Sequence, residues 1–211
     1  MAAANLHIID HPLVQHMLAE ARDVQTPPAA FRALLRRMGG FLAYEALRRV
    51  PQQPRRIVTP LQPMDASVVA APICIVPILR AGLGLAEGAL DVWPDAKVGH
   101  VGLFRDEATL QPVTYYEKLP AAVSEGPVLL IDPMLATGGS ACEAIRRLRS
   151  KGCRDLRLVC LVAAPPGVQR VHELDATIPI YTAALDEKLN ERGYIVPGLG
   201  DAGDRLYGTA E

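Results

Sequence analysis

Five short apolar runs, separated by longer segments of helical pattern, constrain the fold of this chain more than any other feature. They read ICIVPIL from residue 73, VGHVGLF from 98, PVLLID from 127, LRLVCLV from 156 and IPIYTAA from 178. Short runs rich in Val, Ile and Leu are typical of strands buried on both faces. Segments 84–92 and 140–151 fit helices. This alternation predicts an α/β fold, an open, mostly parallel sheet with helices on both faces.

The first 63 residues differ from this pattern. Pro12 can open one helix and Pro27–Pro28 a longer one. A proline-rich stretch over 51–63 indicates an extended arm. The expected apolar faces are Leu13, Met17 and Ala21 in the first helix, and Phe31, Leu34, Leu35, Met38, Phe41, Leu42 and Leu47 in the second.

The bulk properties limit the architecture and the partners. The 211 residues are half apolar, enough for one well-buried core, and no segment resembles a linker. We therefore expect a single domain over 1–211, with the amino-terminal helices packed on the same body. A net charge of -1 offers no broad positive field for nucleic acid or an anionic membrane surface.

Cysteine usage and hydropathy bear on location. The four cysteines show no C-x-x-C spacing, which favours reduced thiols and a reducing compartment. No apolar run reaches the roughly 18 residues of a membrane span, and the start lacks a secretory signal pattern. We expect a cytoplasmic protein.

The glycine-rich carboxyl end contains a G-x-G-x-x-G pattern at Gly198, Gly200 and Gly203. A dinucleotide site requires a strand before such glycines and a second strand ending in an acidic residue about 20 positions later. Only eight residues follow Gly203, so this interpretation fails. The glycines must instead permit sharp turns or close approach to the backbone.

A second segment, IDPMLATGGSA, follows the third apolar run and precedes a helical pattern. Such a loop presents free N–H groups and the positive end of the helix dipole, and Gly138 and Gly139 leave room for a phosphate. The lysine of a nucleoside-triphosphate loop is missing, which favours a monophosphate. Asp132 would accept hydrogen bonds from sugar hydroxyls. The simpler alternative is an ordinary strand–turn–helix with Ser140 as the N-cap.

Four motifs together, VPILRAGLG, HVGLFRD, IDPMLATGGSA and GYIVPGLGDAGDRLYGT, closely resemble the uracil phosphoribosyltransferase family, and the resemblance covers nearly the whole chain. It implies the type I phosphoribosyltransferase fold with a carboxyl-terminal hood that binds the base. The implied reaction transfers ribose 5-phosphate from 5-phosphoribosyl 1-diphosphate (PRPP) to uracil, giving UMP and diphosphate. The implied cofactor is Mg²⁺, bound mainly through the diphosphate, and we predict no separate protein metal site.

Carried over by position, the family's site residues fall into two overlapping groups, with Asp201 and Arg105 in catalytic roles. Arg80 and Arg105 each follow an apolar strand, where a guanidinium can hold a diphosphate bidentately; the alternative for each is a surface ion pair. Uracil binding is expected from Ile195, Gly200, Asp201 and Ala202. The expected PRPP contacts are Arg80, Arg105, Asp132, Pro133, Met134, Leu135, Ala136, Thr137, Gly138, Gly139, Ser140 and Asp201.

Backbone groups of the hood can match the acceptor–donor–acceptor edge of uracil. Cytosine inverts two of these groups, so the site should reject it by about 100-fold or more. Alternative functions are transfer to a purine or orotate, or an RNA-binding regulator of the same fold. Against the last, we find no patch of interleaved basic and aromatic residues.

Other features depart from the family or remain open. One carboxylate, Asp132, stands where the wider class has two, and Phe104 replaces an expected Tyr. DEKLNER, residues 186–192, fits a solvated helix face. The apolar first helices and the arm favour a homo-oligomer, either dimer or tetramer, and the resemblance also implies a possible GTP effector.

Overall fold

The computed structural model describes residues 5–105 and 112–209; of Arg105 and Pro112 it describes the backbone. The main sheet has the strand order β1-β11-β10-β8-β4-β6-β7, and only the β6–β7 pair on this path is antiparallel. The α/β prediction is confirmed. The strands are β1 (Leu6–Ile8), β4 (Cys74–Leu79), β6 (His100–Arg105), β7 (Pro112–Lys118), β8 (Val128–Ile131), β10 (Leu156–Ala163) and β11 (Ile180–Leu185), with the short β5 (Lys97–Val98) beside β4 and β9 (Met134–Leu135) beside β10.

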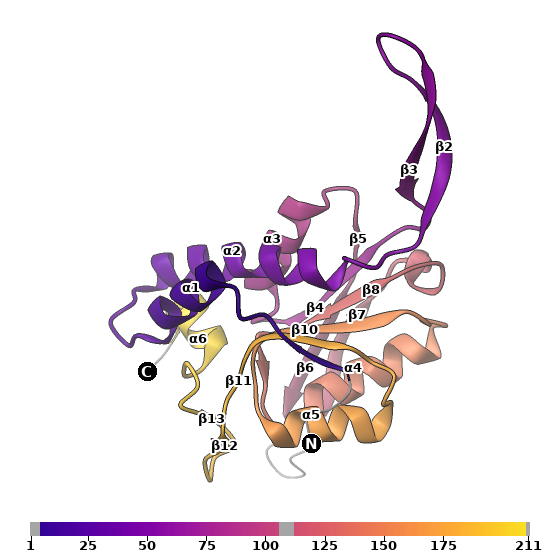
Figure 1. Ribbon diagram of the computed structural model, residues 1–211. Coiled ribbons are helices and arrows are strands. Elements are labelled where there is room, and N and C mark those ends of the chain that lie inside the picture. Colours follow the sequence, from indigo (N-terminus) through magenta and orange to yellow (C-terminus); the bar gives the residue numbers. More distant parts are fainter. Residues whose placement is uncertain (1–4, 106–111, 210–211) are drawn as a thin grey trace.

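Helices cover both faces of this sheet, as the alternating pattern predicts (Figure 1). Strand β10 shows how the two cores form: Val159 and Leu161 join the cluster under the amino-terminal helices, whereas Leu158 and Cys160 join the opposite one. The helices are α1 (Pro12–Arg22), α2 (Pro28–Ala46) and α3 (Leu83–Val92) on one side, and α4 (Gly139–Ser150) and α5 (Pro165–Leu174) on the other, with a 3₁₀ turn η1 at Ala121–Ser124.

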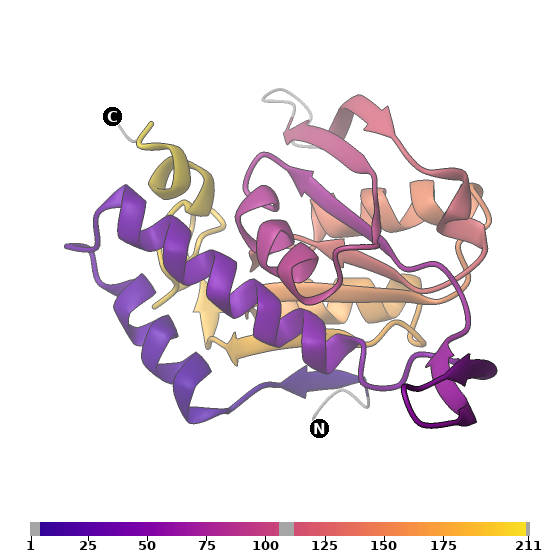
Figure 2. The ribbon, with the colours of Figure 1, turned by 90° about the horizontal axis from the view of Figure 1, so that it is seen from above.

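The two amino-terminal helices begin at the prolines that predict them and pack on the body, as Figure 2 shows from above. Their expected apolar faces are only partly right. Met17 and Ala21 are buried as expected, but Leu13 is 57% exposed, because Val14 and Leu18 complete the buried stripe of α1 in its place. Phe41 is also 41% exposed, although its neighbour Leu42 is fully buried.

The proline-rich stretch forms an antiparallel hairpin of β2 (Gln52–Val58) and β3 (Pro63–Val69), which projects from the body at the amino end of β4 (Figure 1). This confirms an extended arm. Its turn leaves Leu61 95% exposed. All four cysteines are free and buried. Within the described residues, none of the helices combines the length and apolarity required to cross a bilayer.

The carboxyl-terminal segment forms a separate small layer that we call the hood, residues 186–209. It contains the hairpin β12 (Lys188–Leu189) and β13 (Ile195–Val196) followed by α6 (Ala202–Tyr207), beside the carboxyl-terminal end of α1 and the first turns of α2 (Figure 1). The helix expected over DEKLNER is wrong. Asn190 instead accepts hydrogen bonds from the N–H groups of Arg192 and Tyr194, which closes a turn.

Candidate active site at the carboxyl edge of the sheet

The predicted phosphate loop, residues 132–140 and called the phosphate loop below, is fixed to the sheet by backbone hydrogen bonds. The Pro133 carbonyl accepts from Leu161 and Val162 N–H at 2.9 and 3.1 Å, and Leu135 forms part of the short strand β9. On the other side, α5 packs so closely that a Cβ on Gly167 would lie 2.6 Å from the Leu135 carbonyl oxygen. The loop is therefore held between β10 and α5.

This loop delivers a helix amino terminus free of side-chain caps. Gly138, with φ +75°, is the N-cap residue of α4, so the alternative with Ser140 as N-cap is wrong. In the described part of the chain, no side chain bonds the first-turn N–H groups of this helix. Gly139, Ser140 and Ala141 supply these groups, which together with the helix dipole form an anion-binding geometry. The hydroxyl-bearing Thr137 and Ser140 are both half-buried.

Asp132 lies where β8 gives way to this loop, and the N–H of Met134 donates a hydrogen bond to its carboxylate. Desolvation by the surrounding protein raises the pKa of Asp132 to about 7, although the hydrogen bond from Met134 acts in the opposite direction. The carboxyl therefore changes charge near neutral pH. Asp132 is the acidic residue of this loop, and its carboxyl group can accept hydrogen bonds from the hydroxyls of a ligand.

The turn from β4 into α3, residues 80–84, runs between the phosphate loop and the hood. A Cβ on Gly82 would lie 2.5 Å from the Ile131 carbonyl oxygen, and one on Gly84 would lie 2.8 Å from Leu206 of α6. Arg80 opens this turn with a side chain that is 60% exposed. The structure thus brings Arg80 between two segments that are more than 40 residues apart in the sequence.

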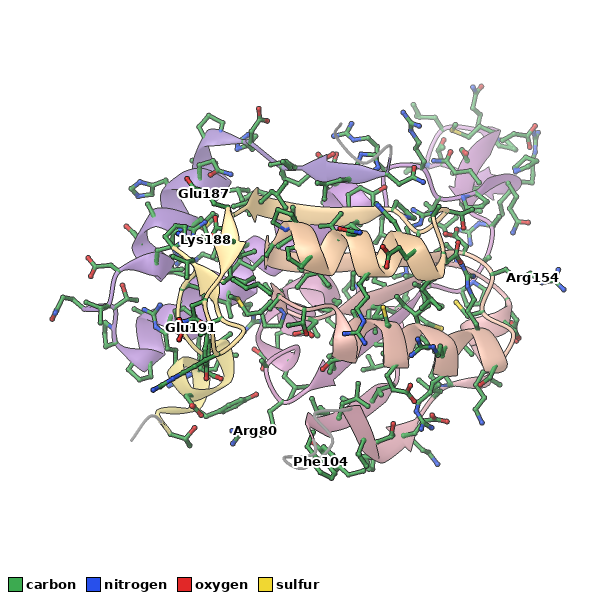
Figure 3. All side chains as sticks on the ribbon, turned by 90° about the horizontal axis from the view of Figure 1, so that it is seen from below. Arg80, Phe104, Arg154, Glu187, Lys188 and Glu191 are labelled. Carbon is green, nitrogen blue, oxygen red and sulfur yellow. The ribbon has the colours of Figure 1, made fainter. Side chains whose placement is uncertain are left out.

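The other predicted diphosphate residue, Arg105, ends β6, and its side chain lies outside the described residues. The preceding Phe104 is half exposed and lies 6.3 Å from the ring of Tyr115 on β7. Figure 3 places Arg80 and Phe104 along the same side of the molecule, whereas Arg154 lies at the far end of the sheet from the hood.

The hood places the four predicted base-binding residues on β13 and at the start of α6. Ile195 and Ala202 are buried, whereas Gly200 and Asp201 are exposed. Asp201 is the N-cap of α6 and accepts a hydrogen bond from the Asp204 N–H at 2.9 Å. Gly198 has φ +60°, and a Cβ there would lie 2.1 Å from the Ile195 carbonyl oxygen, so no larger residue fits.

A buried ion pair that sequence reasoning missed holds the hood in place. Both oxygens of Asp186 accept from Arg22 of α1 at 2.7 Å, and the Gly198 N–H donates to the same carboxylate at 2.8 Å. Arg22 also donates to the Gly198 carbonyl at 2.6 Å. Such a pair is costly to break because removing one partner leaves a buried charge unpaired. The sequence feature that could have indicated this buried carboxylate is the position of Asp186 directly after the apolar run TAAL.

Two further arginines join α6 to the amino-terminal helices. Arg205 donates to the carbonyls of Ala21 and Asp23 at 2.5 and 2.6 Å, and its guanidinium lies 4.2 Å from the centre of the Phe31 ring. Arg32 of α2 donates to the Leu206 carbonyl at 2.6 Å. These contacts connect residues more than 170 positions apart and fix α6 at the edge of the sheet.

The carboxyl edge therefore brings together the helix amino terminus of the predicted phosphate loop, an exposed arginine and a backbone-rich hood. The described residues contain no group of three or more His, Cys, Asp or Glu side chains arranged to hold a metal ion.

Comparison with known proteins gives one consistent result. The sequence model described as uracil phosphoribosyltransferase matches residues 8–209. The uracil phosphoribosyltransferase of Halalkalibacterium halodurans is 53% identical over 207 residues, covering 98% of this chain and 99% of the relative.

Among solved structures, the AQ2163 protein of Aquifex aeolicus aligns with a TM-score of 0.93 and 39% identity, covering 97% of this chain and 99% of that one. An adenine phosphoribosyltransferase of Leishmania donovani aligns with a TM-score of 0.61 at 14% identity, covering 91% of this chain and 88% of the other, which supports the shared fold.

Proposed function

Because this chain belongs to the uracil phosphoribosyltransferase family, we propose that it transfers ribose 5-phosphate from PRPP to uracil and releases UMP and diphosphate. This is a pentosyl transfer of pyrimidine salvage. The observation that carries the proposal is the match over nearly the whole chain. The meeting of phosphate loop, Arg80 turn and hood at one edge supports it, because these parts suit the phosphate, diphosphate and base of the two substrates.

The roles of the residues follow from the chemistry. The bond from the sugar's anomeric carbon to the diphosphate oxygen breaks, and the diphosphate leaves with the electron pair. Uracil N1 forms the new bond and loses its proton. The 5-phosphate would lie on the loop from Ala136 to Ser140, with the rest of the loop, Asp132, Pro133, Met134 and Leu135, lining the ribose side. Arg80 and Arg105 would hold the diphosphate, and positioning with charge stabilisation would provide most of the rate.

In the hood, backbone groups of Ile195, Gly200 and Ala202 would bind the uracil edge, supported by the tight turn at Gly198. Asp201 would orient the ribose. Mg²⁺ bound to the diphosphate would supply further charge neutralisation when the leaving group departs. The proposal assigns the metal to the substrate and not to a protein site.

The substrate assignment is tested by chromatography of reactions that contain PRPP, Mg²⁺ and one base each: uracil, cytosine, hypoxanthine or orotate. We expect UMP from uracil, and a kcat/KM for cytosine at least about 100-fold lower, because two inverted contacts leave buried polar groups unpaired. Nucleotide formation from a purine or orotate would move the assignment to another base. Inactivity with every base, together with salt-dependent RNA retention on filters, would favour the RNA-binding regulator.

The Asp132 carboxyl predicts a pH dependence. Its pKa of about 7 means that the ionised acceptor for ribose hydroxyls forms as pH rises from 6 to 8. We expect kcat/KM for PRPP to rise over this range by about tenfold, with the rise absent in Asp132→Asn. Initial rates at subsaturating PRPP measure this. A profile that is unchanged by Asp132→Asn would assign the titration to another group.

The same pKa predicts an opposite trend in stability. The pKa of Asp132 in the folded protein lies above the ordinary aspartate value of 3.8, so the folded protein binds this proton more tightly than the unfolded chain. The contribution of Asp132 to the free energy of unfolding is therefore fully present below pH 4 and is lost as pH rises to about 7. Urea unfolding of wild type and Asp132→Asn across this range isolates the contribution.

We also propose a homo-oligomer, dimer or tetramer, of one-domain chains spanning residues 1–211. A groove of about 560 Å³ between α1, α2 and α3 is lined by the partly exposed Phe41, Tyr44 and Val92, with charged side chains also in its lining (Arg36, Arg37, Glu45 and Asp91). The arm carries the exposed Leu61. Exposed apolar surface of this kind favours association with a second copy, and sedimentation velocity distinguishes the states.

Two further expectations complete the proposal. The four buried, free cysteines support a reducing, cytoplasmic setting, which fractionation of the source cells would test. GTP as an effector rests on the family resemblance alone, and initial rates with and without GTP would decide it.

A further inference from the structure

Helix α6 contacts Arg80 at three points, and none of them is part of the proposed substrate contacts. The Tyr207 hydroxyl donates a hydrogen bond to the Arg80 carbonyl at 3.1 Å. The Arg80 guanidinium lies over the Tyr207 ring, 5.5 Å from its centre. A carboxylate oxygen of Asp204 lies 3.7 Å from the same guanidinium. One tyrosine thus holds both the backbone and the side chain of Arg80.

These contacts matter because the side chain of Arg80 is long and largely exposed. Its side chain is 60% exposed and those of Tyr207 and Asp204 are partly exposed, so solvent screens the charges. A long exposed side chain samples many rotamers, and holding it in one reduces the entropy lost when a ligand binds. Burial raises the pKa of Tyr207, so its hydroxyl remains a neutral donor. Figure 3 shows Arg80 beside the hood.

The two α6 residues should affect an anion on Arg80 in opposite directions. Tyr207 presents the guanidinium without neutralising it, because a cation–π contact leaves the N–H groups available. Asp204 competes for the same N–H groups and repels an approaching diphosphate. Asp204 has a structural role as well, since it accepts a hydrogen bond from the Thr209 hydroxyl at 2.7 Å. An asparagine keeps an oxygen for that bond but removes the charge.

We propose that Tyr207 and Asp204 are positioning residues that tune diphosphate binding through Arg80, Tyr207 favouring it and Asp204 opposing it. The inference rests on the diphosphate role of Arg80 in the proposed function. It also links the two substrate sites, since α6 begins at Asp201 and Ala202 in the proposed uracil site and ends at Tyr207 against Arg80.

Because Tyr207 favours diphosphate binding and Asp204 opposes it, replacing them should change the KM for PRPP in opposite directions. Tyr207→Phe keeps the ring and removes one hydrogen bond, so the KM for PRPP should rise about fivefold, with kcat within about twofold of wild type. Asp204→Asn should lower the KM for PRPP by about two- to fivefold. General loosening of α6 would instead raise the KM in both variants, and circular dichroism with thermal unfolding would detect it.

The experiment measures kcat and the KM for PRPP at saturating uracil for both variants, each in the wild-type and Arg80→Ala backgrounds. Tyr116→Phe is the matched control, an exposed tyrosine on β7. If the residues act through Arg80, their effects on the KM disappear in the Arg80→Ala background.

The outcomes separate the two proposals. Equal effects in both backgrounds, no effect of either variant, or the same sign for both would overturn the inference. A wild-type KM for PRPP in Arg80→Ala alone would instead contradict the diphosphate role of Arg80, and with it the proposed function's use of this residue.

Discussion

We expect Asp201→Asn to lower kcat by about 100-fold or more while the protein remains folded. The replacement removes one negative charge at the point where the ribose of PRPP and the base are proposed to meet. The fold should tolerate it, because Asp201 caps α6 through the Asp204 N–H and asparagine caps a helix as well as aspartate does. Single-turnover formation of UMP, followed by chromatography, measures the loss.

The control for this variant is Asp95→Asn, which makes the same chemical change at an exposed position between α3 and β5. Its kcat should equal that of the wild type, and both variants should unfold at the wild-type temperature. Near-normal UMP synthesis by Asp201→Asn would exclude a catalytic role for this carboxylate.

The second large effect is expected from the phosphate loop. Gly138 and Gly152 stand at opposite ends of α4 with φ values of +75° and +86°, so alanine is strained at both positions. Each replacement should lower the free energy of unfolding by about 1–3 kcal/mol. Only Gly138→Ala should also affect catalysis, since a Cβ there would lie 3.0 Å from the Gly167 carbonyl and shift the loop.

We expect kcat/KM for PRPP to fall about 10- to 100-fold in Gly138→Ala, the loss of one charged hydrogen bond or slightly more. Gly152→Ala should keep the wild-type value because its Cβ would meet only the Ser124 side chain, at 3.3 Å. Urea unfolding and initial rates of the pair measure the two effects separately. Equal kcat/KM in the two variants would show that residues 136–140 do not hold the phosphate.

The sequence predicts the sheet well because its strands are buried on both faces. Strand β10, for example, is apolar at nearly every position, and such a run has few other stable placements. The turn from β8 into α4 is predictable for a related reason, since Gly138 and Gly139 are local features that do not depend on distant partners.

The hood was less predictable because its contacts are not local. Asp186 lies in a polar run typical of an exposed helix, yet Arg22, 164 positions earlier, makes its burial favourable. No periodicity within residues 186–192 contains that information. The predicted burial of Leu13 and Phe41 is wrong for a simpler reason. Both helices carry apolar residues on more than one side, so the sequence does not fix which side faces the core, and some large apolar side chains remain on the surface.

The fastening of the hood by Arg22, Arg32 and Arg205 has an evolutionary consequence. In the proposed site, selectivity for the pyrimidine edge depends on helices α1 and α2, which contribute no proposed substrate contact. Replacements in the first 46 residues can therefore alter base discrimination while the phosphate cradle, built on the central strands, stays as it is. Drift in the amino-terminal region gives this enzyme a route to new substrates that leaves its sugar-phosphate chemistry untouched.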